Sequence, residues 1–373
     1  HCSMMTRLNA VWIALLLLLT PYNTMGQCEE NFFLGADFSS LSQVEAAGGI
    51  FRYNAQPVDP VFLLAEKGCQ IARIRTWHNP DWLNACNQPN QFGSLNEIIG
   101  TLSRARANGM KLMLAVHYSD HSVDLDYQRL PEAWTSLSTN ALKDSIYNYT
   151  YSMLMQLGTL GLFPEYIQIG NKINNGFCEE ADNTSGFNWS RSGPLLNEAS
   201  RAARNAGYHL QKDLKIVYHI DEPEFVNDWF EAELPNEVTN FDIIGFSYFP
   251  QWSSKNIAET GTIIRQLKYK FRRDVMVLET GYPWTNNWAD NQTNILGSAS
   301  NQHDFFSISQ QGQKQFLESL TQTVIASGGV GLLYWEPTWL STNACTDQGQ
   351  GSPYENAALF NFFSNNEATP AID

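Results

Sequence analysis

Short apolar segments alternate with longer amphipathic segments along the chain, and this alternation restricts the possible folds more than any other feature. The short segments have the length of strands, and most are apolar throughout, which is typical of parallel strands buried on both faces. The predicted strands are 32–37, 71–77, 111–117, 166–170, 214–219, 241–247, 274–279 and 329–335. Predicted helices lie between them, among them 95–108, 141–160, 195–207, 257–271 and 313–326.

Eight β/α units in a chain of 373 residues favour one closed (β/α)₈ TIM barrel, of class α/β, over an open doubly wound sheet. No Pro/Ser-rich linker divides residues 27–373, so we expect them to form a single domain. Active sites of such barrels lie at the C-terminal ends of the strands. The side chains at those ends are therefore the candidates for function.

The N-terminus has the pattern of a signal peptide. Arg7 precedes an apolar run at 11–19, and the small residues Thr24 and Gly26 provide a cleavage site before Gln27. A buried N-terminal helix is the alternative. We expect residues 1–26 to be removed and the protein to be secreted.

Removal of this leader leaves five cysteines, and an odd number requires at least one free thiol. Cys69, in an apolar segment between helix and strand, is the expected free thiol. Cys86, Cys178 and Cys345 fall in predicted loops, where one disulfide among them is compatible with an oxidising compartment. The sequence leaves the pairing open.

The net charge of −15 argues against nucleic acid and anionic membranes as partners. A neutral substrate fits better, and aromatic residues at 13% suit stacking on sugar rings. No Cys/His spacing indicates a zinc site, so we expect neither a metal nor a cofactor. We expect a monomer.

The residues at or just after the predicted strand ends are unusually polar for barrel strands. They are Asp37, Arg75, His117, Asn171, His219, Tyr248, Glu279, Trp335 and Glu336. Taken singly, Glu279 could equally close a structural ion pair, and His117 and His219 would more often be hydrogen-bonded core histidines. Their shared position at strand ends favours a functional interpretation.

Seven motifs around these residues, in this order, resemble glycoside hydrolase family 53, the endo-β-1,4-galactanases that cut type I arabinogalactan. The motifs are Gly35-Ala36-Asp37, Arg73-Ile74-Arg75-Thr76-Trp77, His117-Tyr118-Ser119-Asp120, Gly170-Asn171, Gly245-Phe246-Ser247-Tyr248, Glu279-Thr280-Gly281-Tyr282-Pro283-Trp284 and Tyr334-Trp335-Glu336-Pro337. The resemblance runs from Gly35 to about Phe363. Any one motif is weak evidence, but their ordered combination is specific.

The resemblance implies a retaining mechanism, in which one carboxylate attacks the anomeric carbon and a second group serves as acid and then as base. It assigns Glu279 as the nucleophile. We expect Arg75 to keep Glu279 ionised through a charge-assisted hydrogen bond. The remaining substrate-binding positions that it implies are Asp37, His117, Asn171, His219, Tyr248 and Trp335, with Asn171 at the sugar 2-OH and Trp335 as the stacking floor.

Lys172 departs from the family pattern at the position where the acid/base glutamate should stand. Its neighbours Gly170, Asn171, Ile173 and Asn174 remain in register, which leaves little room for a different alignment. An ammonium group is a poor proton donor at neutral pH. We expect Lys172 to pair with Glu279 and the enzyme to be badly impaired.

Three explanations for Lys172 remain open. It is a single substitution in an active lineage, the mark of a galactan-binding pseudoenzyme, or a residue whose role another acid has taken over, with Glu179 and Glu180 nearest in sequence. We favour the first, because the rest of the motif set is intact. A hydrolase of another β-1,4-linked glycan, such as mannan, is a further alternative. The pattern also lacks the family's usual tryptophan between Asp120 and Asp124.

Overall fold

The computed structural model describes residues 32–80, 92–124, 127–181, 186–233, 238–346 and 349–373. These residues belong to one compact unit, Asn31–Asp373. The predicted leader, residues 1–26, and Cys86 lie outside the described residues. Within the described ranges, no helix has the length and apolar character needed to span a bilayer.

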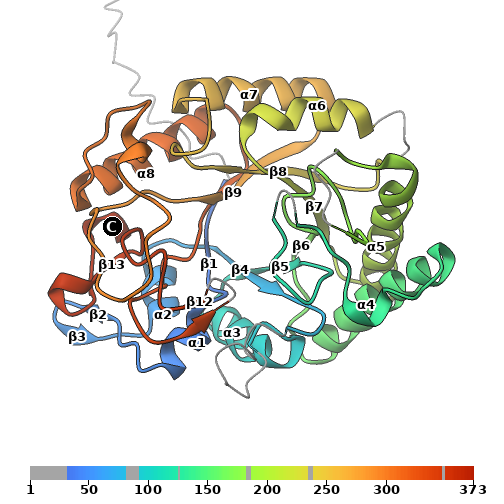
Figure 1. Cartoon of the computed structure of the whole chain (residues 1–373), viewed down its shortest axis with the longest axis horizontal. Coiled ribbons are helices and arrows are strands. Elements are labelled where there is room, and N and C mark those ends of the chain that lie inside the picture. Colours follow the sequence, from blue (N-terminus) through green and yellow to red (C-terminus); the bar gives the residue numbers. More distant parts are fainter. Residues whose placement is uncertain (1–31, 81–91, 125–126, 182–185, 234–237, 347–348) are drawn as a thin grey trace, which may run out of the picture. The chain divides into compact units, whose positions relative to one another are not determined.

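Eight parallel strands close into a barrel in the order β1-β10-β9-β8-β7-β6-β5-β4, which confirms the predicted fold (Figure 1). Every predicted strand segment overlaps one of them, and each predicted C-terminal end lies within one residue of the observed end. Their bounds are β1 Phe33–Asp37, β4 Ile71–Thr76, β5 Lys111–Val116, β6 Tyr166–Ile169, β7 Lys215–Ile220, β8 Ile243–Tyr248, β9 Asp274–Thr280 and β10 Gly331–Tyr334.

Helices surround the barrel and cover the outer faces of its strands (Figure 1). Their amphipathic patterns agree with this position, because the apolar face of a helix packs against the barrel and its polar face is exposed to solvent. The helices are α1 Leu41–Ala46, α2 Pro60–Glu66, α3 Leu95–Ala107, α4 Thr139–Thr159, α5 Trp189–Leu210, α6 Pro223–Glu233, α7 Ile257–Phe271 and α8 Gln310–Ala326. All five named helix predictions overlap an observed helix, most closely 257–271.

The strands are apolar on both faces, but the two faces pack against different partners. Alternate residues point outward into the main core beneath the helices, and the others point into the barrel. The inward residues near the N-terminal ends form a separate apolar layer. Its buried members are Ile71, Met113, Tyr166, Val217, Ile243, Met276, Leu278 and Leu333. This layer closes the barrel below the polar residues at the opposite end.

An irregularity in β9 changes the direction of Glu279. Along β8, Phe246 pairs with Val277 but Ser247 pairs with Glu279, so β9 carries one extra residue at Leu278. Leu278 already belongs to the inner layer, and simple alternation would therefore point Glu279 outward. The bulge allows two successive side chains to face the interior. A charged residue can thus follow an apolar one on the same face.

Smaller elements complete the unit beside the barrel. A four-stranded sheet joins β2 (Arg52–Tyr53), β3 (Gln56–Pro57), β13 (Phe360–Asn361) and β14 (Glu367–Ala368). A short hairpin pairs β11 (Cys345–Thr346) with β12 (Gly349–Gln350).

The cysteine chemistry agrees in part with expectation. Cys69 is a free thiol, as predicted, and Cys178 is free as well. Cys345 is disulfide-bonded. The pairing of Cys345 with Cys178 is thereby excluded.

Replacement of Phe316 by alanine tests the packing between the barrel and α8. Phe316 is fully buried, and its ring stacks with Tyr282 at a centroid distance of 4.7 Å. We expect Phe316→Ala to lower the free energy of unfolding by about 3–5 kcal/mol, because the cavity adds to the lost transfer energy. Urea denaturation followed by circular dichroism measures it. Tyr208→Ala, at a residue 88% exposed, is the matched control, and equal losses in both variants would contradict this account.

Candidate active site

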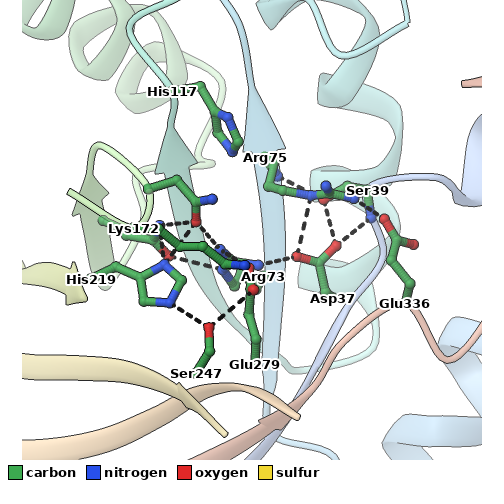
Figure 2. A network of polar contacts seen from close by, with 12 residues as sticks. Asp37, Ser39, Arg73, Arg75, His117, Lys172, His219, Ser247, Glu279 and Glu336 are labelled. Atoms are coloured by element: carbon green, nitrogen blue, oxygen red, sulfur yellow. Dashed lines mark hydrogen bonds and ion pairs between the residues drawn. The ribbon is translucent and has the colours of Figure 1, made fainter. Parts of the chain in front are cut away.

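Polar side chains replace the apolar inner layer at the C-terminal end of the barrel, where Figure 2 shows them joined in one network. Asp37, Arg73, His219, Ser247 and Glu279 come from β1, β4, β7, β8 and β9 in turn. On its strand, each of these residues lies closer to the C-terminal end than the residues of the apolar inner layer. Strands far apart in sequence therefore deliver their charges to one place.

Glu279 is held by a guanidinium and a hydroxyl group. Arg73 Nη2 lies 2.8 Å from its Oε1, and Ser247 Oγ donates a hydrogen bond to its Oε2 at 3.3 Å. Burial alone would raise the pKa of Glu279, but the positive charges of Arg73, Lys172 and Arg75 outweigh it and lower this pKa below its usual value. Glu279 is an anionic carboxylate at neutral pH.

The guanidinium partner of Glu279 is Arg73, and the expectation that it would be Arg75 is wrong. Arg73 also bonds Asp37 Oδ2 at 2.5 Å, Gln168 Oε1 at 2.9 Å and Asn171 Oδ1 at 3.2 Å. Two carboxylates and two amides thus fix a guanidinium whose side chain is fully buried. Asp37 acts here through Arg73, since it too is fully buried.

Arg75 lies nearer the mouth of the barrel and has other partners. Its Nη2 bonds Glu336 Oε1, and its Nε is 3.6 Å from Asp37 Oδ2. Its guanidinium also packs 5.5 Å from the ring centre of Trp335. Burial raises the pKa of Glu336 to about 8 despite the opposing charge of Arg75, with a further contribution from the negative charge of Asp37.

His219 connects Asn171 to Glu279 through Ser247. Its Nδ1 is 2.7 Å from Asn171 Oδ1 and its Nε2 is 2.9 Å from Ser247 Oγ, which in turn bonds Glu279. Burial and the neighbouring Arg73 hold the pKa of His219 well below its usual value, so the ring is neutral. Because His219 is fully buried, it positions Ser247 and Asn171 rather than lining the open cavity.

His117 differs from His219 in having a ring nitrogen without a partner. Its Nδ1 accepts a hydrogen bond from the Val123 amide at 3.2 Å, so the neutral ring carries its hydrogen on Nε2. That Nε2 is buried and has no hydrogen-bond partner among the described residues. Burial, together with Arg75 and Arg73, holds the pKa of His117 well below its usual value. His117 is therefore a neutral donor.

The predicted place of Tyr248 in the subsite is wrong. Along β8, Ser247 faces the barrel interior, so the next residue points outward to the helices. The Tyr248 ring stacks with Phe316 of α8, and its hydroxyl donates to the Lys255 carbonyl at 3.1 Å. Trp335, by contrast, lies at the cavity and is only half-buried.

Lys172 lies just after β6, in a turn that requires unusual backbone angles. Gly170 has φ of 71° and Lys172 itself has φ of 46°, in the left-handed region that side chains disfavour by roughly 1–2 kcal/mol. A methyl group at Gly170 would meet Ile173 Cγ2 at 2.5 Å. Non-glycine residues in such conformations cluster at functional sites.

The ammonium group of Lys172 has two carboxylate partners, and the expected contact with Glu279 is not among them. Its Nζ is 3.1 Å from Asp124 Oδ1 and 3.3 Å from Asp221 Oδ1. Burial would lower the pKa of Lys172, but Asp124, Asp221 and the more distant Glu279 raise it above its usual value. Lys172 is thus a permanent cation at neutral pH.

These residues surround a cavity of about 160 Å³ at the mouth of the barrel. Of the sequence candidates, five line this cavity: Arg75, Asn171, Lys172, Glu279 and Trp335. Sequence reasoning missed Asp124 and Trp252, which also line it, and it missed Arg73 beneath. Arg73 and Arg75 both follow inward-facing Ile71 by even steps, so alternation alone did not distinguish them.

The remaining sequence candidates lie outside this cavity. Glu179 is buried and bonds Ser192 Oγ at 2.6 Å and Arg191 Nη1 at 3.2 Å, which is a structural ion pair. Glu180 is exposed. Among the residues that the structure describes, no group of three or more His, Cys, Asp and Glu side chains is arranged to hold a metal ion.

The comparisons with known proteins agree on one family. The model of glycosyl hydrolase family 53 matches residues 33–373. An arabinogalactan endo-beta-1,4-galactanase of Cellvibrio japonicus (strain Ueda107) is 36% identical, over 96% of this chain and 94% of that protein. An endo-beta-1,4-galactanase of Bacillus subtilis (strain 168) is 30% identical, over 83% of this chain and 71% of that protein.

A solved structure of the same family also has a similar fold. The GH53 catalytic domain of Ignisphaera aggregans superposes with a TM-score of 0.82 at 29% identity, covering 92% of this chain and 94% of that one. The matched region runs from the first barrel strand to the C-terminus and includes every residue of the network around Glu279. This chain therefore belongs to glycosyl hydrolase family 53.

Proposed function

We propose that this glycoside hydrolase acts on β-1,4-galactan by double displacement, with Glu279 as the nucleophile. One observation carries the proposal: Glu279 is ionised, bonded to Arg73, and faces a cavity at the C-terminal end of the barrel. The galactanase names of its relatives support the choice of substrate.

The first step needs an anionic oxygen at the anomeric carbon. Glu279 attacks that carbon, the glycosidic bond breaks, and an ester to Glu279 forms. Arg73 and Ser247 hold the carboxylate in place, which reduces the reorganisation that the attack requires. Trp335 lines the cavity and is only half-buried, which suits it to contact a sugar ring.

The leaving sugar needs a proton in this step, and position 172 does not supply it. A group whose pKa is raised further from neutrality by two carboxylates keeps its proton. We propose that Lys172 impairs cleavage of natural galactan for this reason. The intact network around Glu279 favours a single substitution in an active lineage over a protein that has long lost catalysis.

Restoration of a glutamate tests this account. We expect Lys172→Glu to raise kcat/KM on β-1,4-galactan by roughly 10²–10⁴-fold, because general acid catalysis contributes that much. Reducing-end release measures the rate. Lys172→Gln, which removes the charge without adding an acid, is the matched control and should remain impaired.

Other outcomes of that assay identify the alternatives. Parent activity equal to that of Lys172→Glu would contradict the proposed impairment. Retention on a galactan affinity gel without cleavage by either protein would identify a binding protein instead. Faster release from mannan than from galactan by Lys172→Glu would contradict the assigned substrate.

The Arg73 ion pair makes a prediction about pH. In the Lys172→Glu background, we expect Arg73→Gln to move the acidic limb of the kcat/KM profile to higher pH, because the lost charge no longer lowers the pKa of Glu279. The nucleophile would then be protonated over more of the acidic range. Arg73→Lys keeps the charge and should move the limb less. Thermal melts check that each variant is folded, and an unmoved limb in folded Arg73→Gln would refute the assignment.

We also propose that the protein is exported, which the leader pattern at 1–26 and a polymeric substrate both support. Expression in a secreting host with N-terminal sequencing of the protein in the medium tests this. We expect Gln27 as the first residue. Retention in the cells with the leader attached would contradict the proposal.

A further inference from the structure

The reaction has a second half, in which water must be activated, and Lys172 cannot do this. A protonated ammonium has no lone pair to accept a proton from water. The carboxylate contacts of Lys172 raise its pKa, so it stays protonated. Hydrolysis of the ester on Glu279 therefore needs another base on the same side of the sugar as residue 172.

We propose that Asp124 is the general base of this second half-reaction, taking the proton of the water that attacks the glycosyl ester on Glu279. This assignment rests on the proposed function, because it requires the ester on Glu279. It deepens that function by naming a catalytic residue beyond the two that the family pattern supplies.

Position is the first argument for Asp124. Of the described residues that line the cavity, the carboxylates are Glu279 and Asp124. Asp124 Oδ1 lies 3.1 Å from Lys172 Nζ, so it is next to the acid/base position. In a retaining mechanism, water enters from the side that the acid/base group occupies. Asp124 is therefore on the side where the water must be.

Access to water and a fixed backbone are the second argument. The Asp124 side chain is 67% exposed, so solvent reaches its carboxylate. The Asp124 amide donates to the Tyr127 carbonyl at 3.0 Å, and its own carbonyl accepts from the Tyr127 amide at 3.1 Å. Gln128 Nε2 donates to the same carbonyl at 2.8 Å and also to the Asn171 carbonyl at the same distance. This joins the Asp124 loop to the strand end that carries Lys172.

The neighbouring acids are less suitable. Asp221 also contacts Lys172, but it is largely buried and does not line the cavity. Glu222 is buried and does not line the cavity, and burial with the nearby charge of Asp221 raises its pKa well above the usual value. Glu179 is bound to Arg191 and Ser192.

The proposed step balances without any further reactant. The water oxygen forms a bond to the anomeric carbon while the bond from that carbon to the Glu279 oxygen breaks. The water proton moves to the Asp124 carboxylate, and Glu279 leaves as a carboxylate. Asp124 then releases the proton to solvent, which restores the resting site. Lys172 remains a cation throughout.

The decay of an isolated glycosyl-enzyme tests the second step alone. The parent chain is treated with a 2,4-dinitrophenyl 2-deoxy-2-fluoro-β-galactobioside, whose leaving group departs without a proton. The adduct on Glu279 is freed of excess reagent, and its loss in buffer is followed by intact mass spectrometry. Absence of an adduct on the folded parent, judged against Glu279→Gln, would overturn the proposed function itself.

Comparison of Asp124→Asn with Asp221→Asn then tests the base. Each variant removes one carboxylate partner of Lys172, but only the first removes a carboxylate from the cavity. We expect the adduct of Asp124→Asn to decay roughly 10²–10⁴-fold more slowly, since a general base is lost. The adduct of Asp221→Asn should decay at a rate within about 2-fold of the parent rate, a change far smaller than the loss of a general base.

Azide separates a chemical role from a structural one. It is already an anion and needs no base, so it should restore fast decay to Asp124→Asn and yield a β-glycosyl azide. Equal decay in the parent and Asp124→Asn would overturn the assignment. Slow decay of Asp124→Asn that azide leaves unchanged would also overturn it, because the defect would then lie in the geometry of the ester.

Discussion

The ion pair between Arg73 and Glu279 is the interaction on which the rest of the site depends. Both groups are removed from water, and a buried charge without its partner costs about 3–5 kcal/mol. Arg73 contacts Glu279 with one nitrogen and Asp37 with another, and Arg75 Nε lies 3.6 Å from Asp37 Oδ2, so two guanidinium groups face these two carboxylates. The polar end of the barrel is stable because these charges neutralise one another.

The same arrangement separates the residues that hold the site from those that face solvent. His219, Ser247 and Asp37 are fully buried and act through their neighbours. Trp335, Asp124 and Trp252 lie at the cavity, and Trp252 is 47% exposed. The buried set gives Glu279 one fixed orientation, and the exposed set is available to a polymer. A chain that must bind many similar sugar units benefits from this division.

Much of the fold could be predicted from the sequence, because parallel strands buried on both faces leave a strong apolar pattern. The place of Glu279 at the C-terminal end of a barrel strand could also be predicted, from its motif. The partner of Glu279 could not, since Arg73 and Arg75 face the same way and differ only in depth. Tyr248 could have been rejected by counting alternation from Ser247, which faces inward. The partners of Lys172 come from loops after β5 and β7, and loop geometry leaves no periodic signal in the sequence.

The bulge in β9 has a consequence for how such a barrel tolerates change in length. Point substitutions near Leu278 alter packing locally, but loss of a single residue there would restore regular pairing with β8. The Glu279 carboxylate would then point toward the apolar core between the barrel and the helices, and Arg73 would lose its ion pair with Glu279. Substitutions near Leu278 keep the bulge and therefore the direction of Glu279. A deletion of one residue there would take the Glu279 carboxylate out of the site and would also leave the buried Arg73 without this ion-pair partner.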